Sequence, residues 1–215
     1  MQLLSISEFE AIILKAFRGA GYSWGLSQEA GRAAAWLALR RLPSAASFAT
    51  LLRQIEGQSL ESLAPRRIDG EWCRSEHPIC PVITGTAISD FGWTAGSNII
   101  VGPVFSSMIL IPFAASCAVS AATDLSITID DEELYINSAG KLCTELTGFD
   151  ARQASSVRIA GHDGTDELLY VPAMCRRVPV TESELQIFQS LAHLTYVAAS
   201  DESRSGAGAG LTDND

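Results

Sequence analysis

The residues best suited to bind a ligand lie in two glycine-rich stretches, one near each end of the sequence. The first, GAGYSWGLSQEAGR, contains Tyr22, Trp24, Gly25, Glu29 and Arg32. Free N–H groups at the start of a helix attract anions, and Glu29 and Arg32 are one helical turn apart, so they either pair or face a ligand. The stretch predicts an anion-binding site. The alternative is a helix–loop–helix corner with Trp24 packed in the core.

The second stretch, SRSGAGAGLTDND, closes the sequence. Arg204 can make a two-pronged contact with a carboxylate or phosphate, and Gly206 and Gly208 allow neighbouring N–H groups to form an anion-binding nest. Asp213 and Asp215 carry oxygen ligands that suit a hard cation. We expect this tail to dock on the first stretch, directly or over a bound anion. The alternative is a solvated tail, the usual state of a terminus rich in glycine and aspartate.

Other side chains that could perform chemistry do not form a known motif. Cys73, His77 and Cys80 are possible zinc ligands, but their spacing lacks the paired CxxC of zinc sites. Five cysteines form an odd set without the spacing of a disulfide framework, which predicts reduced thiols. No GxSxG elbow accompanies the serines and histidines. We expect no metal, no cofactor and no disulfide, and the sequence leaves open whether the protein is an enzyme.

The composition argues against several partners and locations. A formal net charge of −10 disfavours nucleic acid and anionic membranes, which both attract basic proteins. The most apolar segment, VFSSMILIPFAASCAVSAA, contains Pro112 and several serines and has no flanking basic residues, which argues against a membrane span. Glu8 and Glu10 interrupt the N-terminal stretch that resembles a signal peptide. We therefore expect a cytoplasmic protein.

Three helices are expected in the first region of the chain, residues 1–57. Ser5 and Glu8 have capping-box spacing ahead of a run of apolar residues at helical intervals. Ser27 is expected to cap the second helix, which Pro43 ends. A third helix follows and ends at Gly57.

The sheet is expected in the second region, residues 58–200. The segments PVITGTAI (81–88) and NIIVG (98–102) have the composition of strands. Residues Val104–Ala121 are expected to form a buried helix that Pro112 kinks or ends.

Alternating side chains over Leu125–Val171 then predict a run of mostly antiparallel strands. Thr181 and Glu184 have capping-box spacing and are expected to open the last helix. Residues 201–215 form the tail. The expected fold class is α+β: an N-terminal helical hairpin or bundle, followed by a mostly antiparallel sheet with a buried central helix and a C-terminal helix.

Three segments resemble one group of bacterial proteins known only as a domain of unknown function. They are FRGAGYSWGLSQEAGRAAAWLALRRLP (17–43), GPVFSSMILIPFA (102–114) and TYVAASDESRSGAGAGLTDND (195–215). Ala198 stands where the pattern has proline, and the tail motif is otherwise present. The resemblance implies a bacterial source and a shared architecture. It implies no activity, cofactor or catalytic residue.

Two functions from different classes fit these features. In the first, the protein binds a small anionic metabolite between the Trp24 stretch and the tail, as a binding protein or enzyme. In the second, it is a non-catalytic subunit or assembly partner of a metabolic enzyme, with another protein chain as its partner and possible homo-oligomers. Polar side chains converging on a concave site favour the first function. An exposed apolar face favours the second.

Overall fold

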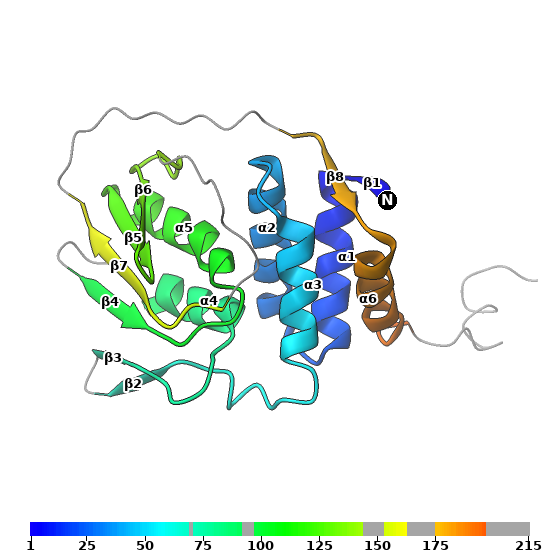
Figure 1. Ribbon diagram of the computed structural model, residues 1–215, viewed down its shortest axis with the longest axis horizontal. Helices are drawn as coiled ribbons and strands as arrows, with labels where there is room; N and C mark the ends of the chain where they lie inside the picture. The colour runs from blue at the N-terminus through cyan, green and yellow to red at the C-terminus, as the bar shows by residue number, and fades with distance from the viewer. Residues whose placement is uncertain (69–70, 92–96, 144–152, 163–174, 197–215) are drawn as a thin grey trace, which may run out of the picture.

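The computed structural model describes residues 1–68, 71–91, 97–143, 153–162 and 175–196. Figure 1 shows three layers: a sheet on the left, a pair of helices beside it, and a helical bundle on the right. Helices and antiparallel sheets share one chain, so the expected α+β class is confirmed. No described helix is both long enough and apolar enough to cross a membrane.

The helical bundle is built from both ends of the chain. Its helices are α1 (Ile6–Gly19), α2 (Trp24–Leu39), α3 (Ser44–Gln54) and α6 (Glu182–His193). Phe9 meets Phe188 edge to face at 6.1 Å between ring centroids, and Phe17 meets Phe48 at 5.9 Å. Edge-to-face pairs of buried rings are a stable packing geometry. These ring pairs join α1 to α6 and α1 to α3. The three helices expected in the N-terminal region, α1, α2 and α3, are confirmed.

Two short strands lead into α1 and α6. Strand β1 (Gln2–Ser5) pairs antiparallel with β8 (Arg177–Val180). Each strand ends at a capping box, formed by Ser5 with Glu8 and by Thr181 with Glu184. Both boxes were expected from the sequence, but the strands were not, because each one finds its partner at the other end of the chain.

The sheet contains four strands in the order β4-β7-β5-β6, and every neighbouring pair is antiparallel. Its strands are β4 (Asn98–Val101), β5 (Leu125–Ile129), β6 (Glu132–Ile136) and β7 (Val157–Gly161). A separate hairpin joins β2 (Arg66–Ile68) to β3 (Glu71–Cys73). The expected antiparallel strands are confirmed for the parts of Leu125–Val171 that the structure describes.

The prediction of a strand at 81–88 was wrong, because Pro81–Phe91 is helix α4. The β-branched residues of this segment favour strands in isolation. However, Val82, Gly85 and Ile88 recur at intervals of three and are buried, and α4 packs against its neighbour α5 (Ile111–Ala121). Burial of this helical face overrides the local preference.

The buried central helix is confirmed in a shorter form than expected. A single 3₁₀ turn, η1 (Ser107–Leu110), leads directly into α5. Pro112 lies in the first turn of α5, where a missing N–H costs nothing. It therefore opens the helix rather than kinking it. Residue Val104 instead makes β-bridges with Ile79 and Ala154.

Candidate functional site

The first glycine-rich stretch begins α2 earlier than the sequence suggested. Ser23, not Ser27, is the N-cap, and its side chain accepts a hydrogen bond from the N–H of Leu26. Ser27 is buried in the next turn and donates its hydroxyl to the Ser23 carbonyl at 2.8 Å. The prediction of Ser27 as the cap was wrong. The helix begins at Trp24, so Ser23 caps its free N–H groups and Ser27 lies one turn inside the helix.

Trp24 is the first residue of α2, and its side chain is 60% exposed. The alternative in which Trp24 packs into the core therefore does not hold. The Arg18 guanidinium lies 5.8 Å from the centroid of the Trp24 ring, a cation–π contact. Gly25 follows, also exposed, with no atom within 4 Å of the place where a Cβ would stand.

Tyr22 is buried, in contrast to the exposed Trp24. Its hydroxyl donates to Cys80 Sγ at 3.4 Å, and burial raises the pKa of Tyr22. Tyr22 also lines a cavity of about 410 Å³ between the ends of α1 and α3 and the second half of α6. With its hydroxyl used inside the core, Tyr22 acts as a packing residue of this cavity wall.

Glu29 and Arg32 form an ion pair, with 2.7 Å between Glu29 Oε1 and Arg32 Nη1. They line a different cavity, of about 340 Å³, between α2, α4 and α5. Asp90 and the hydroxyl of Thr86 lie on the opposite wall, and Thr86 Oγ1 is buried without a hydrogen-bond partner in the described structure. The expected contact between Glu29 and Arg32 is thus present, at a place that Tyr22 does not share.

The expected site residues of the first stretch therefore lie in separate places. Tyr22 lines one cavity, Glu29 and Arg32 line another, and Trp24 and Gly25 line neither. The expected site residues of the tail lie outside the described residues: Arg204, Gly206, Gly208, Asp213 and Asp215.

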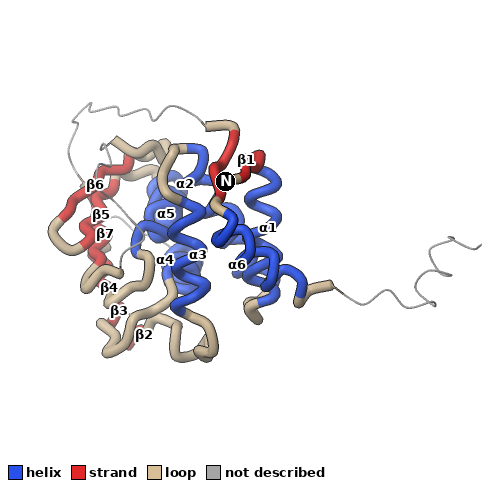
Figure 2. Tube along the Cα trace, turned by 45° about the vertical axis from the view of Figure 1, so that its right-hand side comes forward, coloured by secondary structure: helices blue, strands red, loops and turns tan. Residues whose placement is uncertain are grey.

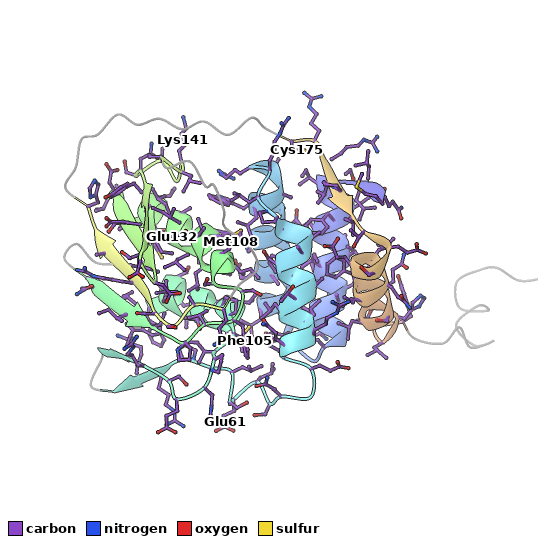
Figure 3. The ribbon with its side chains drawn as sticks, in the orientation of Figure 1. Glu61, Phe105, Met108, Glu132, Lys141 and Cys175 are labelled. Atoms are coloured by element: carbon purple, nitrogen blue, oxygen red, sulfur yellow. The ribbon has the colours of Figure 1, made fainter. Side chains whose placement is uncertain are left out.

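A third and larger cavity, of about 540 Å³, lies between the α2–α3 loop, β8 and the first turns of α3 and α6. We call it the arginine cavity, because Arg41 and Arg177 both line it. Neither forms an ion pair with another described residue. Arg41 has a φ of 59°, in the left-handed region that residues other than glycine seldom adopt. Figure 3 labels Cys175, another wall residue, above the upper ends of α2 and α3.

The start of α3 opens into the arginine cavity without a side-chain cap. Its N-cap is Pro43, which has no side chain able to accept a hydrogen bond. Ala45 and Ala46 line the cavity, and their N–H groups belong to the first turn, where a helix supplies no internal acceptors. The start of α6 differs, because Glu184 accepts a hydrogen bond from the Thr181 N–H at 2.8 Å.

Arg177 also interacts electrostatically with Glu8 at the start of α1. The pKa of Glu8 is lowered by the hydrogen bond from the Ser5 N–H, then by that from the Ser5 side chain, and also by Arg177. Arg177 thus stands near one carboxylate that is already bound in a helix cap. Its guanidinium retains donors for a further anion, since it carries five N–H groups.

Residues 4–72 match a family model described as a protein of unknown function, DUF3726. The expected likeness to a domain of unknown function is confirmed for this segment. No curated protein and no solved structure matches the chain. The matched segment contains α1, α2, α3, β2 and the first two residues of β3, and thus Arg41, whereas Arg177 lies beyond it.

The arginine cavity was missed because its two arginines are far apart in the sequence. One signal could have found it. The tetrapeptide RRLP (40–43) lies in the DUF3726 segment, and RRVP (176–179) lies far downstream. In each, the proline stands two residues after the arginine pair: Pro43 is the N-cap of α3, and Pro179 lies in β8. The fold places the second arginine of each pair in the wall of the same cavity.

The described cysteines divide into buried and accessible thiols. Cys80 and Cys117 are buried, and burial raises the pKa of both. Cys143 and Cys175 are partly exposed, and all four are free. In the described part of the chain, no three His, Cys, Asp or Glu side chains form a group able to hold a metal ion.

We expect thiol reagents to separate these two classes in the folded protein. Attack needs both access and the thiolate, so Cys80 and Cys117 should react more than about 100-fold slower than Cys175. Peptide mapping after alkylation at pH 8 measures each rate, and unfolding in guanidinium should equalise them. Fast native labelling of Cys80 would contradict the burial described here.

Proposed function

We propose that this protein binds a small organic anion, carrying a phosphate or carboxylate, in the arginine cavity. The observation that carries the proposal is the convergence of Arg41, Arg177 and the uncapped start of α3 on one cavity. Guanidinium groups and free helix N–H groups are the donors that bind phosphate and carboxylate most strongly. Glu184 also lines the cavity, but its carboxylate accepts the Thr181 N–H in the cap of α6, so two guanidinium groups face one carboxylate that is already bound.

The other walls indicate what the rest of the ligand should resemble. Leu42, Pro43, Val178 and Pro179 supply apolar surface. A cavity of about 540 Å³ falls within the usual range of small-molecule sites, which combine apolar walls with a few polar groups. An anion with a small apolar body therefore fits better than a bare ion.

The proposal retains the anionic ligand class expected from the sequence and changes the site. Trp24 and Gly25 line none of the three cavities described above. In the cavity that Arg32 lines, Glu29 already binds this arginine, and Asp90 adds a second carboxylate. Two acidic groups beside one arginine disfavour an anion there.

Calorimetric titration of the full chain with phenyl phosphate and with inorganic phosphate tests the proposal. Arg41→Gly removes the guanidinium and leaves the left-handed backbone free of strain, and Arg177→Ala removes the second one. Each change should weaken phenyl phosphate binding by about 10- to 100-fold, the effect of losing a hydrogen bond to a charged group. Phenyl phosphate should bind more tightly than inorganic phosphate.

Arg32→Ala is the matched control, because it removes an arginine from the cavity between α2, α4 and α5. It should leave phenyl phosphate binding unchanged. Equal binding by the wild type and all three variants would refute the site, and a loss confined to Arg32→Ala would move it to the other cavity. Urea unfolding of each variant establishes that the fold is retained.

A further inference from the structure

A basic and aromatic surface lies on the second half of α1, which packs against both α2 and α6. We define it by Lys15, Arg18, Trp24, His193 and Tyr196, which are all exposed. Lys15 Nζ is 5.5 Å from the centroid of the Tyr196 ring, and the rings of His193 and Tyr196 are 5.3 Å apart. Arg18 lies over Trp24. Figure 2 shows α1 and α6 side by side, and α1 carries both Lys15 and Arg18, one from each set of contacts.

The two large aromatic side chains of this surface are more exposed to solvent than is usual for Trp and Tyr. Trp24 and Tyr196 are about three-fifths exposed, at 60% and 58%. Large aromatic side chains beside cations are typical of surfaces that bind another chain segment. Lys15 and Arg18 are one turn apart on α1 and carry the same sign, so the surface suits an acidic segment.

We propose that this surface binds the acidic C-terminal segment of the same chain, residues 201–215. That segment contains four acidic residues, Asp201, Glu202, Asp213 and Asp215, against one basic residue, Arg204. The last residue that the structure describes, Tyr196, belongs to the surface itself. The acidic segment therefore follows a few residues after its proposed docking place.

Chain length and charge both allow this contact. The segment from 197 to 213 can extend about 3.3–3.6 Å per residue, which is ample to return to Arg18 from Tyr196, and the glycines of GAGAG permit a reversal. Because the contact is intramolecular, the effective concentration reaches the millimolar range. Contacts too weak to hold a separate peptide, such as exposed ion pairs, therefore count for more when the tail is part of the same chain.

Carbodiimide cross-linking of the full chain tests this proposal, because the sequence has only two lysines, Lys15 and Lys141. Figure 3 labels Lys141 on the sheet side of the molecule, away from α6, so it is an internal control. We expect amide links from Lys15 to acidic residues of 201–215 in the monomeric fraction, and few from Lys141. The proposal does not depend on the arginine cavity, and it holds whether or not phenyl phosphate binds there.

Arg18→Gln should lower the yield of the Lys15 links about fivefold, and 1 M NaCl should lower it similarly, because exposed ion pairs are screened by salt. Asp90→Asn, remote from the tail in sequence and on α4, should leave the yield unchanged. Absence of Lys15 links, or equal yields from Lys15 and Lys141, overturns the proposal. Links found only in covalent dimers also overturn it, and would assign the surface to the tail of a second copy.

Discussion

Gly19→Ala should displace α6 from α1 and lower the free energy of unfolding by about 3 kcal/mol. A Cβ added at Gly19 would overlap the carbonyl group of Leu191, which belongs to the backbone of α6. Overpacking of this kind costs about 1–3 kcal/mol when side chains can adjust, and more when they cannot. A backbone carbonyl has no rotamer to change, so α6 must move and weaken the contact between Phe9 and Phe188.

Gly25→Ala is the matched control for this experiment. Gly25 also lies in a helix, but no atom stands within 4 Å of its added Cβ. Alanine should stabilise α2 there by up to about 1 kcal/mol, since glycine has the greater freedom in the unfolded chain. Urea unfolding followed by circular dichroism measures both changes. A stability of Gly19→Ala equal to that of the wild type would mean that the two helices are not in close contact.

Gly85→Ala should have the second large effect, at the seam between α4 and α5. The added Cβ would overlap the Phe113 side chain near its own Cβ and Cγ, the part of the ring that cannot swing away. The expected loss is about 2–3 kcal/mol, from the upper part of the range for overpacked cores. The measurement is again the free energy of unfolding in urea.

A second change should recover part of this loss. Phe113→Leu removes ring volume from the same place, so the double variant should be more stable than Gly85→Ala alone. Neighbouring residues that compete for space show coupling energies of about 0.5–3 kcal/mol in double-mutant cycles. Strict additivity of the two changes would show that Gly85 and Phe113 do not compete for this space.

The sequence predicts those elements whose causes are local. The starts of α1 and α6 follow from Ser5 with Glu8 and Thr181 with Glu184, because each capping box is complete within four residues. Strands β1 and β8 have no such signal, since a four-residue strand is defined by its partner, and the partner lies at the other end of the chain. The prediction of a strand in the α4 segment was wrong for a related reason. Its β-branched residues favour a strand locally, and only packing against α5 makes the helix more stable.

The candidate site was less accessible to prediction than the fold. The pairing of Glu29 with Arg32 could be read from their spacing alone. The arginine cavity could not, because Arg41 and Arg177 come together only after β8 has paired with β1 beside the start of α3. The RR-x-P pattern occurs at both places, but it does not predict that the two arginines line the same cavity.

The pairing of β1 with β8 also has a consequence for how the protein is made. A ribosome releases α1, α2 and α3 early, yet the face of α1 that carries Phe9 gains its partner Phe188 only when most of the chain has been synthesised. Contacts between such distant residues slow folding, and an apolar face left open meanwhile invites aggregation. Nascent chains halted before residue 177 should therefore depend on chaperones, whereas the finished chain closes that face by itself.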